Sequence, residues 1–189
     1  MGLSSTGKTE LAKAVTEALT GDEKNALVID FSQVQTMHDF KARILGLRDG
    51  YGNPIPSDFM MHYDRMDGDV VVIFDELANV RDPDLLKSLY DFFREPILST
   101  FSDGKERIMS RVKVIVTGNS GLELYKNVPR DVPMEQQMSA WEAISKSLAA
   151  DPEAQRAVLE KNFPEPLINR WGMNNIFFVP PHTYKSLKK

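Results

Sequence analysis

The first residues of this chain that could do chemistry form a glycine-rich run. Residues 2–9 read GLSSTGKT and match the phosphate-binding pattern G-x-x-x-x-G-K-[ST]. Lys8 can reach the β- and γ-phosphates of a nucleotide, and the Thr9 hydroxyl can bind Mg²⁺. The residues whose backbone N–H groups would surround the phosphates are Gly2, Leu3, Ser4, Ser5, Thr6 and Gly7. The helical run ELAKAVTEALTG follows, so a helix N-terminus would also face the anion. The alternative is a glycine-rich turn that only caps a helix.

Two adjacent carboxylates follow the most apolar segment of the chain. Residues 69–77 read DVVVIFDEL, a buried strand that ends in Asp75 and Glu76. At the carboxyl edge of a parallel sheet, Asp75 would hold Mg²⁺, and Glu76 would polarise an attacking water as general base. The alternative is a helix N-terminus that carries two acids. A later strand, VIVTGNSG, reaches Asn119, whose amide could bind the γ-phosphate or the water, although Thr-Gly-Asn also suits an ordinary turn.

Strands alternate with helices along the chain. Apolar runs predict strands over residues 26–31, 70–74, 111–117 and 175–179, the first covered on both faces. Helical spacing predicts helices over residues 9–19, 37–45, 84–93, 134–150 and 152–162, with Asp-Pro pairs starting two of them. Residues 47–58 read as a loop and residues 95–110 as a loop or hairpin. This order predicts an α/β fold with a mostly parallel sheet.

Composition limits the function classes. The 189 residues suffice for one ordinary domain, and the net charge of −4 disfavours nucleic acid as the main partner. The absence of cysteine excludes disulfides and thiol catalysis and fits a reducing, cytoplasmic location. No apolar run approaches the ~20 residues that span a bilayer. The histidines show no ligand spacing; we expect His38 and His62 on the surface or in loops, and no metal except Mg²⁺ brought by a nucleotide.

The ordered motifs resemble a known family. The series GLSSTGKTELAKAV, ALVIDFS, GYG, VVVIFDEL, VIVTGNSG and FPEPLINRW is similar to the AAA+ ATPases, specifically the second ATPase module of Clp-type unfoldases and disaggregases. The resemblance covers nearly the whole chain and implies a three-layer P-loop NTPase fold. It implies Walker A roles for Lys8 and Thr9, Walker B roles for Asp75 and Glu76, and a sensor-1 role for Asn119.

The same resemblance assigns two further residues. Arg170, in PEPLINRW, matches an arginine finger that would reach a neighbouring subunit's site. On its own this arginine would be read as a surface salt-bridge residue. Tyr51, in DGYGN, matches the aromatic pore-loop residue that grips polypeptide, although one residue of the usual loop is missing. The alternative for Tyr51 is a turn whose ring packs on the domain surface.

The sequence therefore predicts an AAA+ core (large) subdomain over residues 1–189 that binds ATP and Mg²⁺, hydrolyses ATP in a ring, expected to be hexameric, and remodels a polypeptide substrate. Three departures from the family are visible: no strand precedes the loop, no lid domain follows, and FDELANV replaces the usual sequence after the acids. We therefore expect a core trimmed at both ends. Alternatives are a nucleotide-binding scaffold with little turnover, a small-molecule kinase and a DNA-directed AAA+ machine.

Overall fold

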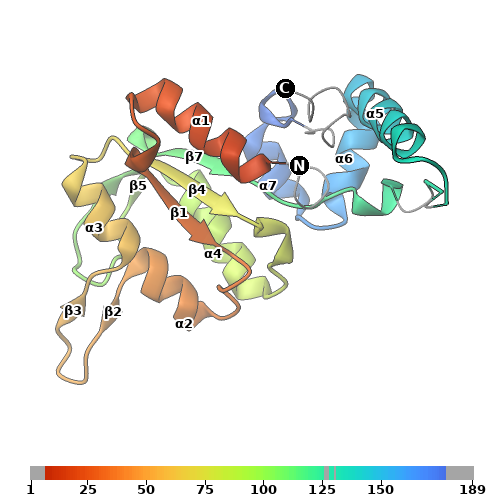
Figure 1. Ribbon diagram of the computed structural model, residues 1–189. Helices are drawn as coiled ribbons and strands as arrows, with labels where there is room; N and C mark the ends of the chain where they lie inside the picture. Colours follow the sequence, from red (N-terminus) through yellow and green to blue (C-terminus); the bar gives the residue numbers. More distant parts are fainter. Residues whose placement is uncertain (1–6, 126–127, 130, 178–189) are drawn as a thin grey trace. The chain divides into compact units, whose positions relative to one another are not determined.

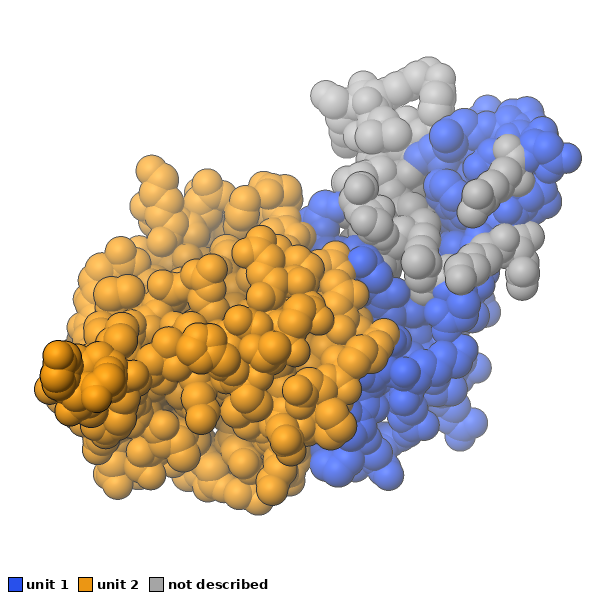
Figure 2. Space-filling view, turned by 90° about the horizontal axis from the view of Figure 1, so that it is seen from below, with its two compact units in different colours: residues 1–8, 118–189 blue, residues 9–117 orange. Residues whose placement is uncertain are grey.

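The computed structural model describes residues 7–125, 128–129 and 131–177. The chain divides into two compact units, which Figure 2 distinguishes by colour. Unit 1 comprises residues 1–8 and 118–189, and unit 2 comprises Thr9–Thr117. Unit 2 contains the parallel sheet, whereas the described part of unit 1 is helical. None of the helices in the described ranges combines the length and apolarity needed to cross a membrane.

The sheet of unit 2 is parallel, as the sequence predicted. Within the described residues its strands are β1 (Ala26–Asp30), β4 (Val71–Asp75) and β7 (Lys113–Val116), in the order β1-β4-β7. The register pairs Asp30 with Asp75, so both strands end at one edge of the sheet. β4 is central, and its four apolar residues are buried. The prediction that the first strand is covered on both faces is wrong, because β1 lies at the edge and exposes Val28.

Helices cover both faces of this sheet (Figure 1). Alternate residues of β4 point to opposite faces, so Phe74 and Asp75 have different neighbours. The Phe74 ring meets Phe92 of α4 (Pro83–Arg94) at a centroid distance of 5.5 Å. The Asp75 carboxylate meets Thr9 of α1 (Lys8–Thr20) on the other face. Unit 2 is therefore layered as helix, sheet and helix.

Local signals set the helix ends of unit 2. Asp82 caps α4 by accepting hydrogen bonds from the Asp84 and Leu85 N–H groups, and Pro83 follows in the first turn. Ser57 caps α3 (Asp58–Arg65). The predicted helix over residues 37–45 is α2 (Met37–Phe40) continued by the π-helical turn η2 (Lys41–Leu45). Single 3₁₀ turns complete the unit: η1 (Glu23–Asn25), η3 (Leu77–Asn79) and η4 (Met109–Arg111).

Unit 2 also contains two short hairpins. Residues 47–58, predicted as a loop, contain β2 (Leu47–Arg48) paired antiparallel with β3 (Pro54–Ile55). The Asp49 carboxylate holds the turn by accepting from the Tyr51 and Asn53 N–H groups. The hairpin alternative for residues 95–110 is confirmed by β5 (Ile97–Leu98) and β6 (Arg107–Ile108), which pair antiparallel.

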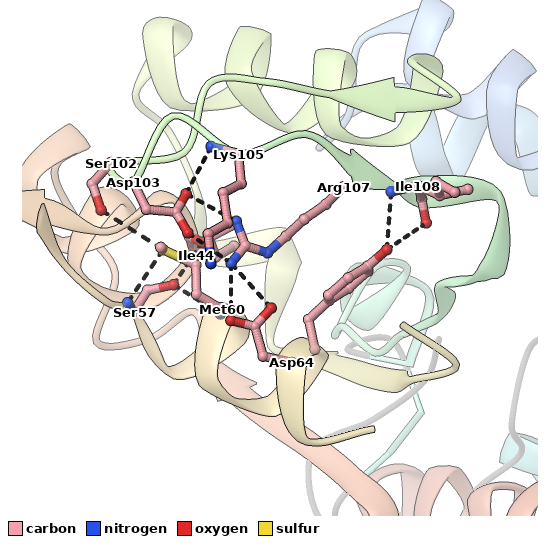
Figure 3. A network of polar contacts seen from close by, with 10 residues as sticks. Ile44, Ser57, Met60, Asp64, Ser102, Asp103, Lys105, Arg107 and Ile108 are labelled. Carbon is pink, nitrogen blue, oxygen red and sulfur yellow. Dashed lines mark hydrogen bonds and ion pairs between the residues drawn. The ribbon is translucent and has the colours of Figure 1, made fainter. Parts of the chain in front are cut away.

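A buried cation ties the second hairpin to α3 (Figure 3). The Arg107 guanidinium is 2% exposed and contacts both carboxylate oxygens of Asp103 at 3.1 Å and both of Asp64 at 3.2 Å. Its charge also lies 4.5 Å from the Phe101 ring centroid. The neighbouring Ser102 donates its N–H to the Leu45 carbonyl at 2.7 Å. Arg107, Asp103 and Asp64, the Arg107 cluster, thus join the 99–106 loop to α3. Ser102 joins the same loop to Leu45, just before the β2–β3 hairpin.

The described part of unit 1 is a small helical assembly. Its elements are η5 (Leu122–Tyr125), α5 (Met134–Ala150), α6 (Pro152–Glu160), α7 (Glu165–Trp171) and η6 (Met173–Asn175). Asp151 caps α6 as predicted. Phe163 packs edge-on against Trp171, with centroids 5.0 Å apart. The strand predicted over residues 175–179 is not present in its described part, where Asn175 ends η6; residues 178 and 179 lie outside the described residues.

Candidate functional site

The phosphate-loop pattern is described only at its end. Gly2, Leu3, Ser4, Ser5 and Thr6 lie outside the described residues. Gly7 has φ +73°, in the left-handed region that glycine enters without steric cost. Lys8 then begins α1. The described turn therefore leads from a glycine into a helix N-terminus, as the motif requires.

Thr9 and Asp75 lie together although 66 residues separate them. The Thr9 hydroxyl is 3.1 Å from Oδ1 and 3.0 Å from Oδ2 of Asp75. An ionised carboxylate only accepts hydrogen bonds, so the hydroxyl is the donor. Both groups offer hard oxygen atoms, which suit Mg²⁺. No group of three or more acidic or histidine side chains in the described residues is arranged to hold a metal.

Glu76 follows β4 in an unusual backbone conformation. Its φ of 57° and ψ of 32° lie in the left-handed helical region, which costs a non-glycine residue on the order of 1–2 kcal/mol. The Glu76 N–H donates to Thr117 Oγ1 at 3.2 Å, and the residue precedes η3. Such strain persists only where surrounding contacts maintain it, and it is concentrated at functional sites.

Thr117 is not among the residues that the sequence predicts for the site. Its side chain is 4% exposed, and its hydroxyl donates to Asp75 Oδ1 while accepting from the Glu76 N–H. The signal in the sequence is the position of Thr117 directly after the apolar residues of β7, two residues before Asn119 in VIVTGNSG. When a buried strand lies next to a strand that ends in an acidic residue, a threonine at the corresponding end is a candidate hydrogen-bond partner for that acid.

A second pair of predicted residues meets within unit 1. The Lys8 ammonium, on a largely buried side chain, donates to Asn119 Oδ1 at 2.8 Å across 111 residues of sequence. A buried ammonium needs hydrogen-bond acceptors, and this amide oxygen supplies one. The residues predicted for the Walker A lysine and for sensor 1 are therefore direct hydrogen-bond partners in this structure.

The two residues assigned only by resemblance lie elsewhere. Tyr51 is 93% exposed at the tip of the β2–β3 hairpin. Arg170 is exposed in the last turn of α7, in unit 1. The alternative in which the Tyr51 ring packs on the domain surface does not fit its exposure.

The histidine prediction is half correct. His38 is exposed in α2, but His62 is buried in α3, so its assignment to the surface or a loop is wrong. Arg65 donates to His62 Nδ1 at 2.8 Å, and Nε2 lies 3.0 Å from the Asn25 carbonyl. Nδ1 must therefore be the acceptor and Nε2–H the donor, which defines a neutral ring. Burial, with the Arg65 charge, lowers the pKa of His62 below 6.5.

Sequence comparisons point to one group of proteins. No family model matches the chain. It is 29% identical to AAA+ ATPase ClpV1 of Pseudomonas aeruginosa over 171 residues, 89% of this chain and 17% of the relative. It is 29% identical to chaperone protein ClpB of Aquifex aeolicus over 100% of this chain and 18% of the relative. The chain thus spans less than a fifth of the length of these curated relatives.

Solved structures share the fold. A closed-state reconstruction of Hsp104 with ATPγS and FITC casein aligns with a TM-score of 0.64 at 25% identity, covering 89% of this chain and 26% of that one. An extended-conformation Hsp104:casein complex of S. cerevisiae aligns with a TM-score of 0.69 at 23% identity, covering 98% and 29%. The predicted α/β fold of a P-loop NTPase is therefore confirmed.

Proposed function

We propose that this chain, which is homologous to the Clp-type AAA+ chaperones as its motifs predicted, binds ATP with Mg²⁺ and hydrolyses the γ-phosphate. The observation that carries the proposal is the hydrogen bond between Thr9 and Asp75. It joins the hydroxyl of the phosphate-loop pattern to the acid that ends the buried strand β4. Neither residue type is rare, but their contact is what a Walker A and Walker B pair requires.

Each residue has a chemical role in this proposal. Lys8 and the loop N–H groups bind and neutralise the phosphates. Thr9 and Asp75 hold Mg²⁺, which, when bound, offsets phosphate charge. Glu76 accepts a proton from the attacking water. The water oxygen bonds to the γ-phosphorus while the bond between that phosphorus and the ADP oxygen breaks. Asn119 positions that water or the γ-phosphate.

The proposal extends to assembly and substrate. We assign Arg170 to a neighbouring subunit's site, where its guanidinium would stabilise charge on the transferring phosphoryl group. This role requires a ring, which we expect to be hexameric. The exposed Tyr51 ring would contact a polypeptide, since an aromatic face binds many sequences. A casein-bound neighbour is compatible with this assignment. The 189 residues would then act as the AAA+ core subdomain.

Phosphate release tests the catalytic proposal. The purified chain is mixed with ATP and Mg²⁺, alone and as Glu76→Gln, with the exposed Glu106→Gln as matched control. Removing a general base should slow turnover about 100-fold or more, whereas the control should match the wild type. Binding of a fluorescent ATP analogue should survive in both variants. Equal turnover by Glu76→Gln and wild type would refute the role of Glu76, and binding without any turnover would favour the scaffold alternative.

Light scattering tests the assembly proposal. With ATP, the wild-type chain should form a ring, whose mass gives the subunit number. If rings form, Arg170→Ala should retain them and lose turnover. A chain that stays monomeric with ATP would contradict the roles of both Arg170 and Tyr51.

A further inference from the structure

We infer that Thr117 is a positioning residue for the acid pair Asp75 and Glu76. This inference rests on the proposed function for its catalytic meaning, but its geometric basis is independent of nucleotide. The hydroxyl of Thr117, the residue after β7, contacts the side chain of Asp75, which ends β4, and the backbone N–H of Glu76, which follows β4. Because Thr117 is 4% exposed, it acts through the acids rather than on a ligand.

The directions of these hydrogen bonds are fixed by chemistry. The Asp75 carboxylate can only accept a hydrogen bond, so Thr117 must donate its single hydroxyl proton to Oδ1. The Glu76 N–H can only donate, so it takes a lone pair of the same oxygen. A threonine or serine satisfies both demands at once. Valine has nearly the same shape and satisfies neither.

Backbone bonds of Thr117 enclose the same short segment. Its N–H donates to the Phe74 carbonyl at 2.9 Å, and its carbonyl accepts from the Leu77 N–H at 3.1 Å. The bond to Phe74 continues the parallel pairing of β4 and β7 past the last residue of β7. The bond to Leu77 captures the chain after the left-handed residue Glu76. Asp75 and Glu76 are therefore bracketed by one residue of the neighbouring strand.

The hydroxyl then has a defined consequence for each acid. It occupies one position on Asp75 Oδ1, which limits rotation of the carboxylate that would share Mg²⁺ with Thr9. It also stabilises the left-handed conformation of Glu76, which sets the direction of the side chain proposed as general base. Loss of the hydroxyl should disturb metal binding and water activation without removing either acid.

A matched set of variants separates positioning from general stability. Thr117→Val removes the hydroxyl and keeps the shape, whereas Thr117→Ser keeps the hydroxyl. Thr16→Val is the control, because Thr16 is also buried but its hydroxyl donates only to the Ala12 carbonyl within α1. Nuclear magnetic resonance of the whole chain without nucleotide then reports on the Glu76 amide.

The nucleotide-free measurement decides the inference. In wild type, Thr117→Ser and Thr16→Val, we expect left-handed carbon chemical shifts at Glu76 and slow exchange of its amide proton. In Thr117→Val, both features should be lost. Retention of both in Thr117→Val would overturn the inference. An unprotected Glu76 amide in wild type would also overturn it, and that result needs no variant that folds.

Kinetics tests the catalytic consequence separately. Thr117→Val should lower kcat by about 10- to 100-fold and raise the Mg²⁺ concentration for half-maximal rate, as loss of a ligand's supporting partner does. Its affinity for ATP in the absence of metal should match wild type, and Thr117→Ser should recover most of the rate. A Thr117→Val rate equal to wild type would refute the kinetic part. A wild-type chain with no ATPase activity would defeat the proposed function, while the resonance result would still decide the geometry.

Discussion

Replacing Arg107 by methionine should destabilise unit 2 while leaving its apolar packing largely in place. Methionine keeps an unbranched stem that can lie against Phe101, but it removes the cation that faces Asp103 and Asp64. Truncating one partner of a buried ion pair costs about 3–5 kcal/mol, because the remaining charge is left poorly solvated.

The surroundings of the two carboxylates place the expected loss at the lower end of that range. Asp64 is 57% exposed and can be rehydrated by water. Asp103 is only 15% exposed, but it keeps a hydrogen bond from the Lys105 N–H at 3.1 Å. We therefore expect a loss of about 3 kcal/mol, equivalent to a fall in Tm of roughly 6–12 °C for a chain of this size.

The assay must report on unit 2 specifically. Both tryptophans, Trp141 and Trp171, belong to unit 1, so their fluorescence is an unsuitable probe of the Arg107 cluster. Hydrogen exchange of the buried β4 amides measures the free energy of opening of unit 2, which contains Arg107. Arg43→Met is the matched control, because Arg43 forms an exposed pair with Asp58 that should contribute about 1 kcal/mol or less. If Arg107→Met and Arg43→Met lowered the free energy of opening by the same amount, the argument that burial makes the Arg107 ion pairs stronger would be refuted.

Three further outcomes follow from the same contacts. Gly46→Ala should lower the unfolding free energy of unit 2, measured by chemical denaturation, by about 2–4 kcal/mol, because the φ of Gly46 is +81° and a Cβ would lie 2.8 Å from the Ile55 carbonyl oxygen. Gly52 has a φ of +86° but open space around it, so Gly52→Ala should lower the same free energy by only about 1–2 kcal/mol. The lowered pKa of His62 should make stability fall as pH drops from 6.5 through the folded-state pKa, and His62→Gln should flatten that part of the pH–stability curve. The Arg107 side chain is the main cause of the lowered pKa of Asp103, so the stabilisation from ionised Asp103 should be complete above pH 3.8 and decline as pH falls through the folded-state pKa. It should be smaller in Arg107→Met, where only the Lys105 N–H and charge still lower that pKa.

Short-range signals explain why most of the fold was predictable. The Asp82 cap and the Asp151 cap act on N–H groups two or three residues away, so the sequence contains both partners. Gly21 ends α1 with φ +82° for an equally local reason. The continuous apolar run before Asp75 predicted a buried strand, and β4 is such a strand.

The features that escaped sequence reasoning depend on distant partners. β1 has the same apolar character as β4, but its exposure depends on its place at the edge of the described sheet. The burial of His62 depends on the Asn25 carbonyl, 37 residues away. The role of Thr117 depends on Asp75, 42 residues earlier in the chain. The periodicity of a single segment does not reveal partners that lie far away in the sequence. The burial and contacts of these residues are therefore known only once the packing of the elements is known.

The apolar core also determines which way the acids point. Phe74 and Asp75 are consecutive, so they must face opposite sides of the sheet. The Phe74 ring packs against Phe92 and lies 5.0 Å from the Phe31 ring, which fixes its side as the α4 side. Asp75 is thereby directed toward Thr9, and a slip of one residue along β4 would bury its charge among aromatic rings instead. The aromatic packing of one face thus enforces the polar arrangement of the other, and the Thr117 contacts then restrict the remaining freedom of Asp75 and Glu76.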